Sequence, residues 1–425
     1  MNPRFLITVL LLAATNSAPA QSVVVRADRM LDVTTGRIMA HATVLVDRGR
    51  ITAVNPASVP QGAKVIDLGD MTLMPGFIDA HVHLLMDDAG TYRMQLVTDN
   101  ASHAALRGAN NARTTLLAGF TTVRDLAQVN PALDLITVSL ADASEREWID
   151  APHIVACGHA LSPTGGHIDP AMHLGAAEGV MDLGPDYGIA DGVDQVVHAV
   201  RYQIKHGAKV IKIGATAGVM SLEASVGAQQ YSDAEMKAIV DEANMHGIPV
   251  AAHAHGTEGI KAAIRAGVAS IEHGSLLDDE AIRMMKERGT YLVPTTGLSD
   301  LIAMDQLPPP VRAKAQDVLP KARASVSRAI QAGIKIALGT DAPLVPHGQN
   351  AKEFTALVAR GMTPIDAIRA GTMNAAELLR VLDRGRIAEG LLADLVAVRG
   401  NPLENIRTLE DVRFVMKSGK VYKQP

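Results

Sequence analysis

The chain has 425 residues, a formal net charge of −5, and a hydrophobic content of 48% with only 3% aromatic residues. Its core must therefore consist mainly of Ala, Val, Leu, Ile and Met, as in Val- and Ile-rich parallel sheets covered by Ala-rich helices. The slightly acidic balance gives no sign of a nucleic-acid partner. The length suits one large α/β unit with additions.

The first 20 residues predict a secretory signal peptide. Arg4 gives a short positive end, Phe5–Ala14 is an apolar run too short to span a bilayer, and Ala18-Pro19-Ala20 suits a small-residue cleavage site. A buried first strand is the alternative. No later segment has the length of a membrane span, so we expect a secreted or periplasmic mature protein without a membrane anchor.

Short strands of alternating polarity are expected at both ends of the chain. They cover Val23–Ala27, Ala42–Asp47, Arg50–Val54, Asp394–Val398 and Arg413–Tyr422. Asp47-Arg48-Gly49-Arg50 and Lys417-Ser418-Gly419-Lys420 suit tight hairpin turns. We therefore predict a small β-sandwich domain that residues 21–72 and 383–425 build together.

The middle of the chain repeats one unit, a helix followed by a glycine and a short apolar strand. Glycine is the usual helix stop because it adopts a left-handed conformation without strain. Strands are expected after such glycines at Phe120–Arg124, Lys209–Ile213, Ile248–Ala252, Val268–Glu272, Thr290–Pro294 and Ile334–Gly339. A strand ending at His83 and another at His153–Ala156 bring the number to eight. Eight such units predict a (β/α)₈ TIM-type barrel over residues 73–382.

Metal-ligand residue types recur where these strands end. His81 and His83 are spaced i, i+2 in a strand, so both side chains point to the same side and suit a divalent metal. Surface or core histidines are the alternative for an isolated pair. In a barrel, however, the carboxyl ends of all strands meet at one face. The residues expected there are His81, His83, Lys212, His253, His255, His273 and Asp341.

These motifs resemble the amidohydrolase superfamily, and within it the metal-dependent Xaa-Pro dipeptidase and carboxypeptidase-like group. The resemblance spans nearly the whole chain after residue 20. It is carried by Pro75-Gly76-Phe77-Ile78-Asp79-Ala80-His81-Val82-His83, Val210-Ile211-Lys212-Ile213, Val250-Ala251-Ala252-His253-Ala254-His255-Gly256, Ile271-Glu272-His273-Gly274 and Gly339-Thr340-Asp341-Ala342-Pro343. The sequence is also similar to bacterial amidohydrolases that split the mycotoxin ochratoxin A at its phenylalanine amide.

The resemblance implies two divalent metal ions, usually Zn²⁺. By analogy, one metal is bound by His81, His83 and Asp341 and the other by His253 and His273, with CO₂-carboxylated Lys212 bridging them. The residues agree with this arrangement. Lys212 alternates with two isoleucines and must point inward, where an ammonium group beside two cations would be repelled but a carbamate would not. A lysine that extends its amine to the surface is the alternative.

The resemblance also implies roles in catalysis. Asp341 is expected to take a proton from the attacking water and pass it to the leaving amine. Tyr231 resembles the tyrosine that contacts the substrate carbonyl or carboxylate, although a loop aromatic on the barrel rim is equally expected. His255 is a candidate neighbour of the ligands or substrate contact. His159 and His167, in a glycine-rich loop, are candidate substrate or oxyanion contacts.

We expect a substrate with an amide or peptide bond, namely an N-acyl or dipeptidyl amino acid with a free carboxylate, plausibly including ochratoxin A. Arg124 and Arg201 are the candidate partners of that carboxylate. Three alternatives stay open: a mononuclear barrel deaminase, a cyclic-amide or lactone hydrolase, and a non-catalytic assembly module. The family often forms homo-oligomers, so a homo-oligomer is expected here.

Overall fold

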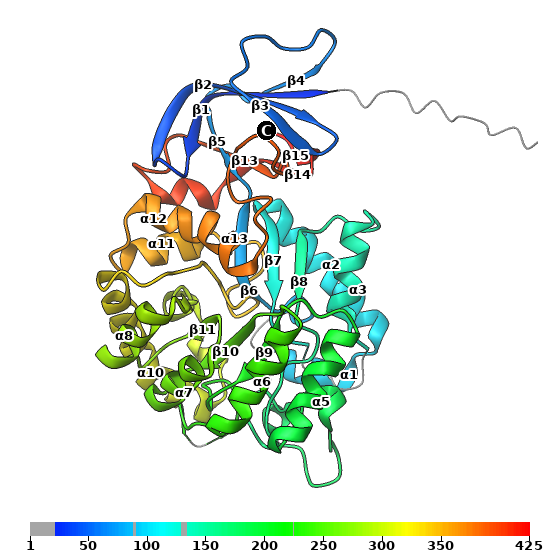
Figure 1. Ribbon diagram of the computed structural model, residues 1–425, viewed down its shortest axis with the longest axis vertical. Coiled ribbons are helices and arrows are strands. Elements are labelled where there is room, and N and C mark those ends of the chain that lie inside the picture. Colours follow the sequence, from blue (N-terminus) through cyan, green and yellow to red (C-terminus); the bar gives the residue numbers. More distant parts are fainter. Residues whose placement is uncertain (1–21, 88–90, 129–133, 224) are drawn as a thin grey trace, which may run out of the picture.

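Strands from both ends of the chain meet in one sheet (Figure 1). The computed structural model describes residues 22–87, 91–128, 134–223 and 225–425, so the predicted signal peptide lies outside the described residues. The sheet has the order β15-β14-β13-β5-β1-β2-β3, with β4 also paired to β1. Its strands are β1 (Val23–Asp32), β2 (Arg37–Asp47), β3 (Arg50–Val54), β4 (Lys64–Asp67), β5 (Met71–Pro75), β13 (Leu395–Arg399), β14 (Val412–Lys417) and β15 (Lys420–Lys423).

This terminal sheet confirms the two predicted hairpin turns. Arg48 and Gly49 have φ values of 47° and 78°, and Ser418 and Gly419 have φ values of 48° and 77°. Two consecutive left-handed residues are what a tight turn between twisted antiparallel strands requires. The predicted β-sandwich is corrected to one continuous eight-stranded sheet, because β5 pairs with β1 on one edge and β13 on the other. The domain boundaries stay a prediction.

Seven buried strands lie below this sheet in two parallel sheets, β6-β7-β8 and β12-β11-β10-β9 (Figure 1). They are β6 (Phe77–Val82), β7 (Phe120–Asp125), β8 (His153–Ala156), β9 (Ile211–Gly214), β10 (Val250–Ala254), β11 (Ser270–His273) and β12 (Tyr291–Val293). Almost every residue in them is buried, which is typical of parallel strands covered on both faces.

The eighth predicted strand, Ile334–Gly339, is not a regular strand. This segment makes isolated parallel bridges instead, between Leu292 and Ile336 and, just beyond it, between Val82 and Ala342. A third bridge, between Leu161 and Ile213, links β9 to the segment that follows β8. The mixed α/β class is therefore confirmed. Among the described residues the inner strands form two sheets and not one closed ladder, so the barrel stays a prediction.

Helices surround the inner strands (Figure 1). They are α1 (Tyr92–Thr98), α2 (Ala101–Leu117), α3 (Ile136–Glu145), α4 (Pro170–Leu174), α5 (Gly192–Lys205), α6 (Asp233–Met245), α7 (Thr257–Ala266), α8 (Asp279–Arg288), α9 (Leu298–Leu301), α10 (Pro309–Gln331), α11 (Lys352–Ala359), α12 (Pro364–Ala370) and α13 (Met373–Leu379). A capping box of Ser232 and Glu235 begins α6, and Thr363 caps α12 before Pro364.

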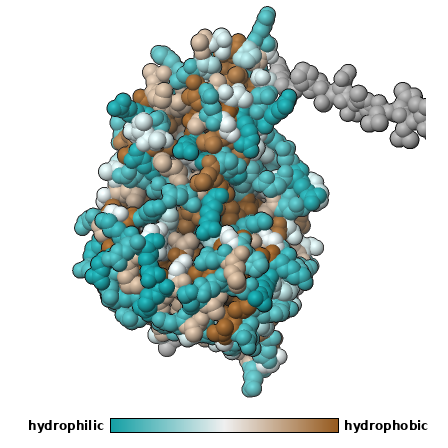
Figure 2. Space-filling model, in the orientation of Figure 1, coloured by the Kyte–Doolittle hydropathy of each residue, from teal (hydrophilic) through white to brown (hydrophobic). Residues whose placement is uncertain are grey.

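The high apolar content lies in the interior. One cluster of buried side chains runs from the inner strands to the surrounding helices, and a second consists mainly of side chains of the terminal sheet. Hydrophilic residues cover most of the face in Figure 2, with hydrophobic residues in smaller patches. Among the helices that the structure describes, none is long and apolar enough to cross a membrane.

Candidate active site

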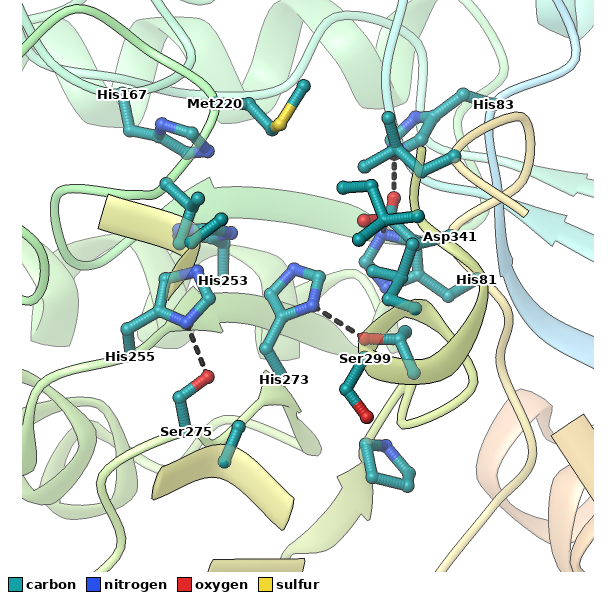
Figure 3. Close-up of a pocket in the computed structure, with 18 of the residues that line it drawn as sticks. His81, His83, His167, Met220, His253, His255, His273, Ser275, Ser299 and Asp341 are labelled. Carbon is teal, nitrogen blue, oxygen red and sulfur yellow. Dashed lines mark hydrogen bonds and ion pairs between the residues drawn. The ribbon is translucent and has the colours of Figure 1, made fainter. Parts of the chain in front are cut away.

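The first group of candidate ligands joins β6 to the segment after Gly339. His83 Nε2 donates a hydrogen bond of 2.9 Å to Asp341 Oδ1, and His81 Nε2 lies 3.4 Å from the same oxygen (Figure 3). Asp341 has a φ of 59°, an uncommon left-handed conformation for a residue other than glycine. Burial raises the pKa of Asp341, but neighbouring His81, the hydrogen bond from His83 and Lys212 outweigh it, and the pKa falls below its usual value.

Asp79 fixes these two segments to each other. Its carboxylate is fully buried and accepts hydrogen bonds from His81 N (3.0 Å), Thr340 Oγ1 (2.7 Å) and Asn350 Nδ2 (2.8 Å). Burial raises the pKa of Asp79 to about 6 in spite of these bonds. Because Asp79 holds the backbone of His81 and the side chain of Thr340, which precedes Asp341, this carboxylate sets the spacing of the first group.

Glu272 decides which nitrogen of His81 is available to a ligand. His81 Nδ1 donates to Glu272 Oε2 at 2.9 Å, and Glu272 Oε1 accepts from Arg124 Nη2 at 2.9 Å. Burial raises the pKa of Glu272, but Arg124 and the bond from His81 lower it to about 2, so the side chain is a carboxylate. An ionised carboxylate only accepts hydrogen bonds, and the proton of His81 therefore sits on Nδ1. The lone pair of Nε2 is left facing Asp341.

The second group contains imidazoles alone. His253 is the last residue but one of β10, His255 follows directly after that strand, and His273 is the last residue of β11. Ring centroids are 4.6 Å apart for His253–His255 and 4.8 Å apart for His253–His273. Hydrogen bonds join His255 Nδ1 to Ser275 Oγ at 2.7 Å and His273 Nδ1 to Thr295 Oγ1 at 2.8 Å. His273 has a left-handed φ of 70°.

Lys212 lies in the same cavity as both groups. Its side chain is 3% exposed, and the flanking isoleucines of β9 are fully buried. Burial lowers the pKa of Lys212 to about 8, although Glu272 and Asp341 act in the opposite direction. A larger fraction of this amine is therefore uncharged near neutral pH than for an exposed lysine.

His167 is the one candidate substrate contact of the glycine-rich loop that reaches the cavity. Its ring stacks on His253 with centroids 4.1 Å apart, and both side chains are seen in Figure 3. Its Nδ1 is hydrogen-bonded to Ser221 Oγ at 2.7 Å. The carbonyl of His167 accepts from His173 Nε2 at 2.7 Å, and His173 Nδ1 in turn accepts from the Tyr92 hydroxyl at 2.9 Å. Tyr92 and His173 also line the cavity.

Four residues that were predicted to contact the substrate are absent from the described residues that line the cavity. His159 is buried, with Nδ1 bonded to the Gln128 carbonyl, and the hydroxyl of fully buried Tyr231 has no hydrogen-bond partner among the described residues. Arg124 is enclosed with Glu272, and exposed Arg201 pairs with Glu242. The candidate carboxylate partners are thus corrected: both guanidinium groups are engaged elsewhere.

The arrangement suits divalent metal ions. Ligand atoms of His253, His255 and His273 lie within 4.8 Å of one another, as do those of His81, His273 and Asp341, so His273 belongs to both sets. Burial lowers the pKa of these histidines, to about 4 for His81 and His255, which keeps the imidazoles in the neutral form that binds metals. His83 Nδ1 and His253 Nε2 are buried without a hydrogen-bond partner among the described residues. Such nitrogen and oxygen donors could hold a divalent metal.

Sequence reasoning missed the supporting residues Asp79, Glu272 and Asn350. Asp79 and Glu272 stand inside the two motifs that carry His81 and His273, but no role was predicted for either. One signal was present, because a charged residue in a short apolar strand must be paired when buried. Asn350 follows a loop and carried no comparable signal.

The chain belongs to the amidohydrolase family, whose sequence profile matches residues 72–422. It is 39% identical to the ochratoxinase of Aspergillus niger over 375 residues, which are 83% of this chain and 76% of that protein. A crystal structure of a Xaa-Pro dipeptidase with methionine bound in its active site aligns with a TM-score of 0.89 and 37% identity, covering 95% of this chain and all of that one.

The crystal structure of A. niger ochratoxinase aligns with a TM-score of 0.82 and 34% identity, covering 96% of each chain. The chain is therefore an enzyme, a hydrolase that acts on amide bonds of small molecules.

Proposed function

We propose that the protein is a binuclear metal-dependent amidohydrolase that releases amino acids from N-acyl amino acids or dipeptides. The observation that supports this most is the pair of ligand groups that share His273 and enclose Lys212 in one buried cavity. The proposal includes a closed (β/α)₈ barrel, in which the segment Ile334–Gly339 completes the ring of inner strands through its isolated bridges.

One ion would be held by His81, His83 and Asp341, and the other by His253 and His273. The second set offers only neutral nitrogens, so an anion close by would strengthen the binding of a dication there. Lys212 would supply it as a carbamate: its uncharged amine attacks CO₂, a C–N bond forms, and one proton leaves. The lowered pKa of Lys212, caused mainly by burial, favours the reactive free amine. Zn²⁺ suits the proposed nitrogen and oxygen donors.

When bound, the two ions supply a nucleophilic water at neutral pH and polarise the amide carbonyl. The residues do the rest. Asp341 is ionised near neutral pH and accepts the proton of the attacking water. It then gives this proton to the leaving nitrogen, so that the amine departs neutral. Glu272 keeps the ring of His81 in one tautomer and one orientation throughout.

The substrate class follows from the relatives. One acts on ochratoxin and another is a Xaa-Pro dipeptidase that holds methionine, so both accept an amino acid joined through an amide. Ochratoxin A is a plausible substrate as an N-acyl phenylalanine. We further propose export through the signal peptide of residues 1–20, to the periplasm or outside the cell, and assembly into a homo-oligomer.

The test is a panel of dipeptides and N-acyl amino acids incubated with the Zn²⁺-loaded protein, together with metal analysis. The expected result is hydrolysis with about two equivalents of metal, and loss of hydrolysis when a chelator removes them. If the protein held one equivalent of metal and its activity survived Lys212→Ala, a mononuclear deaminase would be favoured instead. No metal and no turnover would leave an assembly module, and cleavage of rings alone would favour a cyclic-amide or lactone hydrolase.

A further inference from the structure

The cavity has two chemically different sides. One side carries the histidines, Lys212 and Asp341. The other is an apolar wall built by the loop before α6, by α9 and by α10. We define the apolar wall as Met220, Leu298, Ile302, Leu319, Ala322 and Val326. Figure 3 shows Met220 on the far side of the cavity from His273 and Ser275 in that view.

The apolar wall has no charged partner for a substrate. Among the described residues that line the cavity, the only lysine, arginine, aspartate or glutamate side chains are Lys212 and Asp341, and both belong to the ligand side. The internal segments outside the description, 88–90, 129–133 and 224, contain no Lys or Arg.

Two cations that contact the loop carrying Met220 are already engaged. Lys314 of α10 donates to the carbonyls of Gly218, Ser221 and Glu223 at 3.1, 2.7 and 2.9 Å, which occupies all three of its protons. Arg93 donates to the carbonyls of His173 and Met220. These bonds hold the loop that carries Met220 against the cavity and leave Lys314 no proton for a substrate carboxylate.

A charged group that entered this wall would lose its hydration without gaining a partner, whereas an apolar group gains from leaving water. We propose that the apolar wall makes the enzyme selective for amides whose substituent next to α10 is apolar and uncharged, with Ala322 as a specificity-determining residue. This inference rests on the proposed amide hydrolysis. A substrate carboxylate would have to lie on the ligand side of the cavity.

The test compares kcat/KM for a matrix of substrates in which one position changes at a time. The acyl group is hexanoyl or glutaryl, and the amino acid is leucine, glutamate or lysine. The wild-type enzyme should prefer the apolar member by about 100-fold or more at one of the two positions, because a pocket without a charged partner rejects a charge strongly. Equal rates for apolar and charged members at both positions would overturn the inference.

Two variants on α10 locate the selectivity. Ala322 is partly exposed to the cavity, whereas Ala324 is exposed on the outer side of the same helix, so Ala322→Lys and Ala324→Lys are matched in composition and helix propensity. Ala322→Lys should reduce the preference at least about tenfold by favouring the acidic substituent, and Ala324→Lys should leave it unchanged. A uniform change for all substrates in Ala322→Lys would contradict the proposal.

A second variant and a binding measurement cover the remaining outcomes. Leu319→Ala widens the wall and should lower KM for a longer apolar substituent, even if Ala322→Lys does not fold. Calorimetry with hexanoate against glutarate and leucine against glutamate measures the same selectivity without turnover. Equal binding of both members in both pairs overturns the inference, whereas selective binding without hydrolysis of any amide leaves the wall intact and overturns the proposed function.

Discussion

The two ligand groups of the cavity differ in charge. The first, around His81 and His83, contains the carboxylate of Asp341 and is supported by ionised Glu272, whereas the second, around His253, contains imidazoles whose partners are hydroxyls. An anionic set compensates part of the charge of a dication, whereas a neutral set leaves that charge uncompensated and binds more tightly when an anion lies close by. Lys212 lies in the same cavity and is the group that could become that anion, so the two sides should respond differently to mutation.

Asp341→Asn is expected to have the largest effect. The change removes both the anionic ligand of the first group and the proton acceptor, so kcat should fall by about 10³-fold or more. Asp317→Asn, on the exposed surface of α10, is the matched control and should leave kcat unchanged. The measurement is kcat on the best amide of the panel together with metal content. Activity within tenfold of the wild type would remove Asp341 from the proposed acid–base role.

Lys212→Ala should mainly empty the second group. We expect metal content to fall from about two equivalents towards one, and kcat by about 10²-fold or more, because the imidazoles lose their anion. Added acetate or propionate should restore part of the metal content and part of kcat, since a small carboxylate can enter the space that the side chain leaves. Lys205→Ala, an exposed position at the end of α5, controls for the loss of a lysine. Full metal content in Lys212→Ala would contradict the charge argument.

Glu272→Gln should act on the first group through His81. Loss of the carboxylate partner should weaken metal binding by about 10- to 100-fold, which a titration with a competing chelator measures. It should also change the pH dependence of stability. The pKa of Glu272 is about 2 when folded, below its usual 4.5, so the stabilisation is present above pH 4.5 and is lost as the pH falls towards 2.

This contribution is on the order of 3 kcal/mol, and urea unfolding of the metal-free protein between pH 5 and pH 2.5 measures it. The wild-type protein should lose stability more steeply than Glu272→Gln over that interval. Parallel curves for the two proteins would mean that Glu272 is not held as a carboxylate by Arg124 and His81.

The two ligand groups also show how much of the site could be predicted from the sequence. His81, His83, His253 and His273 stand at the ends of predicted strands. Side chains alternate along a strand, and the carboxyl ends of barrel strands meet at one face, so both rules predict that these residues lie together. The structure brings all four to one cavity. Tyr231 was predicted by analogy alone and lies outside the lining residues.

Loops limit what a sequence can predict. His159 and His167 stand in one glycine-rich segment with the same residue type, yet only His167 reaches the cavity, because its backbone N–H is held by Gln230 and its ring by Ser221. Those contacts join residues 54 or more positions apart and have no local signal. For the fold, eight inner strands were predicted and seven are regular strands. The sequence could not predict that Ile334–Gly339 would make an isolated bridge instead, since its composition is that of a strand.

The smallest expected effect on metal binding concerns the second ligand group, which contains imidazoles alone. Ser275→Ala removes the hydroxyl partner of His255, whose ring centroid lies 4.6 Å from that of the proposed ligand His253. Glu272→Gln instead removes a charged partner of the proposed ligand His81. Hydrogen bonds to neutral groups are about half as strong as those to charged ones, so Ser275→Ala should weaken metal binding by about tenfold or less. Ser139→Ala, at an exposed position of α3, is the control. The same chelator titration gives the metal affinities of Ser275→Ala and of the control. An effect on metal binding as large as that of Glu272→Gln would mean that charge does not distinguish the two ligand groups. Lys212 alone would then not explain how the second ligand group holds its ion.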